Sequence, residues 1–222
     1  YLKKNKHEIY FLVLFGLLLI SGVLFGQLNL VKSKNTTFKD NNFLIKIISP
    51  KIRIERFYYT ENEEEIIENL IKLSKPNKEV KTIFVWPEGV FNNTELKNLK
   101  KYQNIFKEKF SNKHLIIFGI NNTVNDKTFN SMAVVNNNLD LIEFYNKNNL
   151  VPFGEFLPLE KLLKNIGMKT ITNFYNSYSA GEKRDTIGLQ NYEFDITFLP
   201  LICYEIIYSG KLSKNNNYDL II

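Results

Sequence analysis

An apolar run near the start of the chain constrains its structure more than any other feature. Residues Ile9 to Gly26 are apolar apart from Gly16, Ser21 and Gly22. About 18 helical residues, each rising 1.5 Å, cross most of the roughly 30 Å hydrocarbon core of a membrane. If the run is extended to Val31, the helix is long enough to cross the whole hydrocarbon core. We therefore predict a transmembrane helix with a basic flank within residues 1–32.

A cleaved signal peptide is the alternative for this run, because three lysines precede it. The run is longer than a usual signal-peptide core, and no clear cleavage site follows it. The lysines do not settle the orientation, since the numbers on the two sides are nearly tied. They are Lys3, Lys4 and Lys6 before the run and Lys32, Lys34 and Lys39 after it.

The composition of the chain is that of a folded domain. It has 222 residues, of which 44% are hydrophobic and 23% are charged, so a disordered chain is not expected. The net charge of +6 is spread over Lys- and Asn-rich loops, without a block of like charges. We predict no nucleic-acid partner, and interpret the charge as favouring solubility and some attraction to anionic lipid.

Cysteine and histidine usage excludes several kinds of site. Cys203 is the single cysteine, which rules out an internal disulfide and a zinc site built on cysteine pairs. The two histidines, His7 and His114, lack the spacing of metal ligands, and no metal or cofactor is expected. A Ser–His–Asp hydrolase would have to use His114, but a lone histidine at a strand edge is usually structural.

After a polar linker at residues 33–42, the chain from 43 to 222 alternates strands and helices. Thr60 and Glu63 form a capping box before apolar residues with helical spacing, and Thr94 is placed to cap a helix through about Phe110. A short helix is expected at 159–166, and Asn136-Asn137-Asn138 predicts a hairpin turn. Apolar runs predict strands at 43–48, 82–86, 115–120, 129–135, 139–145, 194–202 and 219–222. This order predicts an α/β sheet with helices on its outer face.

Three segments carry more functional groups than folding requires. The first, Val85-Trp86-Pro87-Glu88, ends a buried strand in an acid, although a turn with a solvated glutamate would look the same. The second runs from Tyr145-Asn146-Lys147 to Leu150-Val151-Pro152-Phe153-Gly154-Glu155, where the alternative is a surface ion pair. The third, Leu199-Pro200-Leu201-Ile202-Cys203-Tyr204-Glu205, leads a strand into a lone cysteine, which is how a nucleophile is mounted on a sharp turn. A small buried hydrophobe is the alternative there.

Taken together and in order, the three segments resemble the motifs of the carbon–nitrogen hydrolase (nitrilase) superfamily. The long middle motif is the specific part, and it resembles apolipoprotein N-acyltransferases more than soluble nitrilases or amidases. The resemblance runs from about Phe43 to the end of the chain. It implies a nitrilase-like α-β-β-α sandwich, preceded here by one transmembrane helix.

The resemblance also implies site residues. Glu88 corresponds to the general base, Lys147 to the lysine and Cys203 to the nucleophile of a Glu–Lys–Cys triad. Three further positions, Glu155, Tyr204 and Glu205, correspond to residues that support activity in the family. In addition, Asn130-Ser131-Met132 resembles the strand before the lysine, and Ser179-Ala180-Gly181 resembles a Ser-Pro-Gly segment with alanine in place of proline.

The implied activity is transfer of a fatty acyl chain between lipids. A phospholipid would acylate Cys203 as a thioester, and the N-terminal amine of a diacylglyceryl-cysteine apolipoprotein would accept the acyl group. The implied location is the bacterial inner membrane, with the catalytic domain on the periplasmic side. A membrane-tethered amidase or nitrilase, and an inactive remnant of the acyltransferase, remain as alternatives.

The ends of the sequence raise the expectation of a fragment. The chain starts at Tyr1 and stops within the apolar run Leu220-Ile221-Ile222. Members of the resembled family have several spans before the catalytic domain and further strands after the nucleophile. We therefore expect a C-terminally incomplete sandwich, in which side chains such as Ile202 are only partly covered.

Overall fold

The computed structural model describes residues 6–34, 42–50, 62–91, 93–159, 177–190, 194–211 and 217–222. The chain divides into two compact units, residues 1–40 and 41–222. The described part of the first unit is helix α1 (Lys6–Lys34). Its stretch Ile9–Val31 is long and apolar enough to cross a membrane. Ser33 and Lys34, predicted to start the linker, continue this helix, and residues 35–41 lie outside the described ranges.

The second unit is built on a five-stranded sheet with the order β1-β2-β3-β4-β5. Its strands are β1 (Leu44–Ile47), β2 (Thr82–Val85), β3 (His114–Val124), β4 (Lys127–Val135) and β5 (Leu141–Asn146). The first three strands run parallel, and β3, β4 and β5 are antiparallel neighbours. The predicted hairpin on either side of Asn136-Asn137-Asn138 is therefore confirmed.

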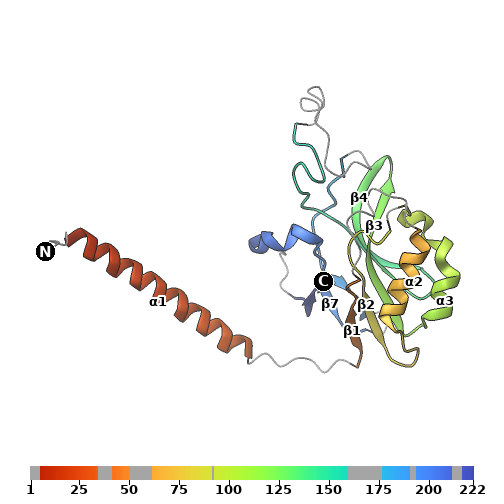
Figure 1. The fold of residues 1–222 in the computed structure, drawn as a ribbon, viewed down its shortest axis with the longest axis horizontal. Helices are drawn as coiled ribbons and strands as arrows, with labels where there is room; N and C mark the ends of the chain where they lie inside the picture. The colour runs from red at the N-terminus through yellow and green to blue at the C-terminus, as the bar shows by residue number, and fades with distance from the viewer. Residues whose placement is uncertain are drawn as a thin grey trace. The chain divides into compact units, whose positions relative to one another are not determined.

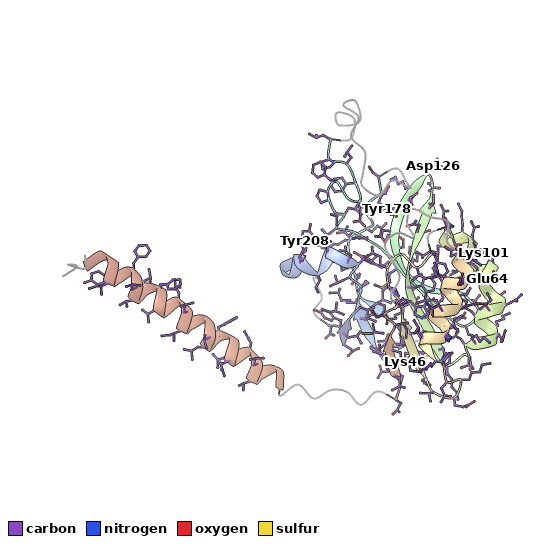
Figure 2. The ribbon with its side chains drawn as sticks, in the orientation of Figure 1. Lys46, Glu64, Lys101, Asp126, Tyr178 and Tyr208 are labelled. Atoms are coloured by element: carbon purple, nitrogen blue, oxygen red, sulfur yellow. The ribbon has the colours of Figure 1, made fainter. Side chains whose placement is uncertain are left out.

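A second hairpin, between β3 and β4, was not predicted. Its turn is Asn125-Asp126, in which both residues have positive φ angles of 49° and 60°. Asn and Asp tolerate this left-handed conformation better than other non-glycine residues. Asp126 lies at the tip of this long hairpin (Figure 2).

A smaller sheet contains three short strands in the order β6-β7-β8. They are β6 (Ile187–Gly188), β7 (Thr197–Leu199) and β8 (Leu220–Ile221). The predicted strand at 194–202 is thus shorter than expected, and β6 was missed. Ile202 is buried rather than partly covered, while Leu220 and Ile222 pack against the core with part of their surface exposed.

The layers of this unit follow from the way in which successive side chains of the central strands point to opposite faces of the sheet. On β2 and β3, Phe84 and Ile116 belong to a core shared with α2 (Glu63–Ser74) and α3 (Gln103–Lys109). Their neighbours Ile83 and Leu115 belong to a second core shared with the smaller sheet. Figure 1 shows that α2 and α3 lie on one side of strands β2 and β3, and that β7 lies on the other side. Helix, sheet and sheet thus form three successive layers of the predicted sandwich.

Two helix starts differ from the prediction. The N-cap of α2 is Asn62, whose side chain accepts a hydrogen bond from the Glu64 amide, while Thr60 lies outside the described residues. The helix expected after Thr94 is a 3-10 helix, η2 (Leu96–Tyr102), followed by α3. Thr94 does not cap it, because its hydroxyl donates to the buried Glu63 carboxylate instead. The helix expected at 159–166 lies, apart from its first residue, outside the described ranges.

Candidate active site

Glu88 lies just beyond the carboxyl end of β2, on a loop that closely approaches β3. The Gly119 amide of β3 donates to the Pro87 carbonyl at 3.4 Å. A Cβ at Gly119 would lie 2.8 Å from the Glu88 Cα, a distance that real Cβ contacts do not show. The glycine therefore lets this loop lie against the strand. The Glu88 side chain is exposed, and its Oε1 accepts a hydrogen bond of 2.7 Å from Asn130 Nδ2.

Lys147 follows β5 and is almost completely buried, with 1% of its surface exposed. Its amide donates to the Asn130 carbonyl at 2.8 Å, which continues the pairing of β4 with β5 for one residue. Its Nζ donates to Glu155 Oε1 at 3.0 Å. A buried ammonium requires such a partner, because an unpaired charge is strongly disfavoured away from water.

The loop after Lys147 returns the Glu155 carboxylate to the ammonium group. The Glu155 amide donates to the Val151 carbonyl at 2.8 Å, and the Val151 amide donates to Glu155 Oε2 at 3.0 Å. Phe153 between them has a positive φ of 63°. Both carboxylate oxygens of Glu155 are therefore held, one by the loop itself and one by Lys147.

Asn130 on β4 joins the two acidic residues. Its Nδ2 donates to Glu88 Oε1 and, at 2.8 Å, to Glu155 Oε1. Because Glu155 also accepts from Lys147, the amide connects the proposed base to the buried lysine through one continuous network. The sequence placed Asn130 on the strand before the lysine but assigned it no role. Nothing in its local pattern indicates that it would lie between two carboxylates.

Cys203 lies on a sharp turn between the smaller sheet and the 3-10 helix η4 (Cys203–Lys211). Its φ of 52° is left-handed, which costs energy in a residue with a Cβ and is one of the strained conformations that cluster at active sites. The residue is exposed overall. Even so, partial burial raises the pKa of its thiol; Glu88 raises that pKa further and Lys147 lowers it. The structure thus brings Glu88 and Lys147 within electrostatic reach of the sulfur.

The two residues after Cys203 have different environments. The Tyr204 side chain is 58% exposed, and its backbone amide lowers the pKa of the Cys203 thiol. Glu205 is completely buried. Its carboxylate accepts hydrogen bonds from the Ile202 amide, the Tyr145 hydroxyl and Arg184 at 2.7–3.0 Å. Burial raises the pKa of Glu205, but these bonds and the one from the Asn149 amide together outweigh it, so that pKa lies below its usual range.

Arg184 and the Tyr145 hydroxyl were not predicted to belong to the site. Tyr145 was part of the second segment without an assigned role, and Arg184 belonged to none of the three segments. Burial and the Glu205 carboxylate raise the pKa of Tyr145 to about 12, so this hydroxyl remains a donor. The two residues surround a carboxylate that is distant in sequence, which explains why a local pattern could not identify them.

His114, which the sequence offered as a possible hydrolase residue, does not join this site. His114 is buried at the start of β3, where its ring contacts the Ser111 amide at 3.1 Å and the Asn77 carbonyl at 2.9 Å. Burial lowers the pKa of His114, which fits the structural role expected of it. Within the described ranges, no three His, Cys, Asp or Glu side chains are grouped to hold a metal ion.

The comparison with solved structures defines the class of fold. An amidase from Nesterenkonia sp. AN1, described as a member of the nitrilase superfamily, matches 78% of this chain and 60% of its own with a TM-score of 0.50 and 8% identity. A second structure of that amidase, with an acetamide moiety on its active-site cysteine, gives the same TM-score over 79% of this chain and 62% of its own. The chain has the mixed α/β fold of the nitrilase, or carbon–nitrogen hydrolase, superfamily.

In sequence, the chain is similar to apolipoprotein N-acyltransferases. The enzyme of that name from Wigglesworthia glossinidia brevipalpis is 29% identical over 96% of this chain and 41% of its own length. The one from Rhodopseudomonas palustris is 34% identical over 41% of this chain and 16% of its own. No family model matches the chain. The chain spans less than half the length of these curated relatives.

Proposed function

We propose that this chain carries the active site of a membrane-anchored acyltransferase with Cys203 as its nucleophile. The observation that carries the proposal is the network Glu88–Asn130–Glu155–Lys147, whose charged members influence the thiol of Cys203, a residue in a left-handed conformation. A carboxylate, a buried cation and an exposed thiol are the groups required for thioester chemistry. The similarity to apolipoprotein N-acyltransferases supports acyl transfer between lipids as the reaction.

In the first half-reaction, Glu88 takes the thiol proton and the Cys203 sulfur attacks the ester carbonyl of a phospholipid. The tetrahedral intermediate then expels the lysophospholipid oxygen, which receives the proton from Glu88. This leaves a fatty acyl thioester on Cys203. Glu88 is suited to proton transfer because its carboxylate is accessible and oriented by Asn130.

In the second half-reaction, the N-terminal amine of a diacylglyceryl-cysteine lipoprotein attacks the thioester carbonyl. Glu88 takes a proton from the amine, the carbon–sulfur bond breaks, and the proton returns to the sulfur. Both half-reactions develop negative charge near Cys203. Lys147 and the Tyr204 amide stabilise this charge, since both already lower the pKa of the thiol.

Exposed apolar side chains beside the nucleophile support lipid substrates. Ile206 and Ile207 of η4 are 51% and 64% exposed. Phe153, on the loop that carries Glu155, is also exposed. Large apolar side chains exposed next to a nucleophile suit an acyl chain better than a small polar amide.

The test of this function is transfer from a labelled phospholipid. The full chain in membranes is incubated with phospholipid carrying a labelled acyl chain, and Cys203 is examined for a thioester by mass spectrometry. We expect a thioester that disappears when a diacylglyceryl-cysteine peptide is added, with the label moving to the peptide amine. Ammonia release from simple amides without such transfer would favour the amidase alternative, and no acylation at all would favour an inactive remnant.

We further propose that α1 anchors the enzyme in the bacterial inner membrane, with the catalytic unit on the periplasmic side. The apolar stretch Ile9–Val31 supports an anchor, since its 23 residues reach about 35 Å as a helix. The full chain is expected to stay with membranes in a carbonate wash, and a variant that starts at Ser33 is expected to be released. Equal release of both would contradict the anchor.

A further inference from the structure

One buried carboxylate connects the turn that carries Cys203 to the strand end that carries Lys147. Glu205 Oε2 accepts from the amide of Ile202, the residue before the nucleophile, at 3.0 Å. Its Oε1 accepts from the amides of Asn148 and Asn149, the two residues after the lysine, at 3.1 and 2.9 Å. The backbones that position the two groups are therefore joined through a single side chain.

Arg184 holds this carboxylate in place. Its Nη2 donates to Glu205 Oε1 at 2.7 Å and to Asn149 Oδ1 at 3.0 Å, and its Nε donates to the Tyr145 hydroxyl at 3.2 Å. Both members of the ion pair are buried. A planar guanidinium presents its donors in a fixed arrangement, so these bonds set the direction of Glu205 as well as balancing its charge.

The segment that carries Arg184 is itself fixed against the lysine. The Gly181 amide donates to the Lys147 carbonyl at 2.8 Å, and the Asn148 side chain donates to the Gly181 carbonyl at 2.9 Å. A Cβ at Gly181 would lie 2.2 Å from the Asn146 carbonyl oxygen, so only glycine fits there. Tyr178, labelled in Figure 2, also donates from its amide to the Glu155 carbonyl.

We propose that Arg184 is a positioning residue for acyl transfer, which holds Glu205 so that the Cys203 turn and the Lys147 strand end keep one relative geometry. The proposal rests on the proposed function for its effect on acyl transfer, although the connection between the two backbones does not depend on it. Arg184 is not expected to contact the substrate, because it acts from inside the protein, behind Tyr145 and Glu205.

Loss of Arg184 should change both the reaction and the surroundings of the thiol. A displacement of about 1 Å in a reacting group can slow a reaction about 100-fold. Charged groups from three elements face Cys203, namely Glu88 after β2, Lys147 after β5 and Glu155 on the following loop. A loosened turn admits water, and the pKa of the thiol, which burial raises, should fall toward the ordinary value of about 8.5.

The experiment compares Arg184→Met and Arg184→Lys in the full chain in membranes, with Lys101→Met as the matched control. Lys101 also faces a buried carboxylate, Glu63, at 3.5 Å. It lies on the helical side of the unit, far from Tyr208 of η4 (Figure 2). Two quantities are measured: the rate of acylation from labelled phospholipid, and the pH dependence of Cys203 alkylation by iodoacetamide without any acyl donor.

We expect Arg184→Met to acylate about 100-fold more slowly and its alkylation midpoint to fall, with Arg184→Lys intermediate in both. Lys101→Met should match the unchanged protein. An acylation rate and alkylation midpoint unchanged in Arg184→Met would overturn the proposal. If Arg184→Met fails to fold, Arg184→Lys is the test variant. An unchanged acylation rate and alkylation midpoint in Arg184→Lys would then overturn the proposal.

The alkylation measurement separates this inference from the proposed function. If the unchanged protein forms no acyl thioester but its alkylation midpoint still falls in Arg184→Met, the acyltransferase proposal fails and the positioning role stands. If the unchanged protein is acylated and neither quantity responds to Arg184, the acyltransferase proposal stands and the positioning role fails.

Discussion

Two buried carboxylates, Glu63 and Glu205, have similar surroundings but connect different parts of the molecule. Glu63 accepts hydrogen bonds from Thr94, from the Tyr102 hydroxyl at 2.7 Å and from the Asn93 amide at 3.0 Å. It thereby joins the start of α2 to both ends of η2. Glu205 accepts a similar set of bonds, but its donors adjoin the proposed nucleophile and lysine.

This comparison shows that burial and hydrogen bonding alone do not mark a functional carboxylate. Burial raises the pKa of Glu63, yet the bonds from Thr94, Tyr102 and Asn93 together outweigh it and lower that pKa, as happens for Glu205. The two differ in which backbones they hold. Glu63 connects a helix to a neighbouring segment, so its loss should affect stability alone. Glu205 connects the backbones that carry Cys203 and Lys147, so its loss should also affect the rate of acyl transfer.

The largest loss of acylation with the smallest loss of stability should come from Cys203→Ala. We expect complete loss of the acyl-enzyme, because Cys203 is the single cysteine and no other thiol can form a thioester. The melting temperature should hardly change, since the residue is exposed. Mass spectrometry of the labelled protein and a thermal melt provide the two measurements. A thioester that persists in this variant would disprove the assignment.

A smaller but still large effect is expected from Glu88→Gln. The amide can still accept from Asn130 but cannot take a proton, so acylation should slow by roughly 10²–10⁴-fold with little change in stability. The control is Glu79→Gln, which changes a surface carboxylate paired with Lys113. Single-turnover acylation rates test this, and equal rates in the two variants would rule out Glu88 as the base.

Changing Glu63 should give the opposite result to changing Glu88. Glu63→Ala leaves the buried Thr94 and Tyr102 hydroxyls without their acceptor, and each such group costs about 1–3 kcal/mol. We expect the free energy of unfolding to fall by at least about 1 kcal/mol, measured by denaturant titration. The acylation rate well below the melting temperature should stay within about twofold. A large loss of rate without loss of stability would show that the two regions are coupled.

The smallest effect should appear in the acid dependence of stability. The lowered pKa of Glu63 contributes stability that is present above its unfolded value of about 4.3 and is lost as pH falls through the folded value. In Glu63→Gln this part of the acid dependence should disappear, as followed by melts between about pH 3 and 7. An identical pH dependence in both proteins would contradict the lowered pKa.

Much of the fold could be predicted from short-range patterns. Apolar runs located the central strands, and Asn136-Asn137-Asn138 located the β4–β5 turn. The start of α2 was placed wrongly, because Asn62 competes locally with Thr60 for the cap. The extent of the helical stretch after Thr94 was predicted well, since η2 and α3 run from Leu96 to Lys109. Only the cap was wrong, because the Thr94 hydroxyl has a partner 31 residues away.

The sequence by itself determined which residues are candidates for chemistry, because Glu88, Lys147 and Cys203 each follow a strand in a recognisable motif. Only the tertiary structure decided how they are held. Asn130 lies between two carboxylates, and Arg184 balances Glu205, because distant segments fold against one another and exclude water. A buried charge must find a partner wherever the fold places one, and the local pattern of residues does not contain that information.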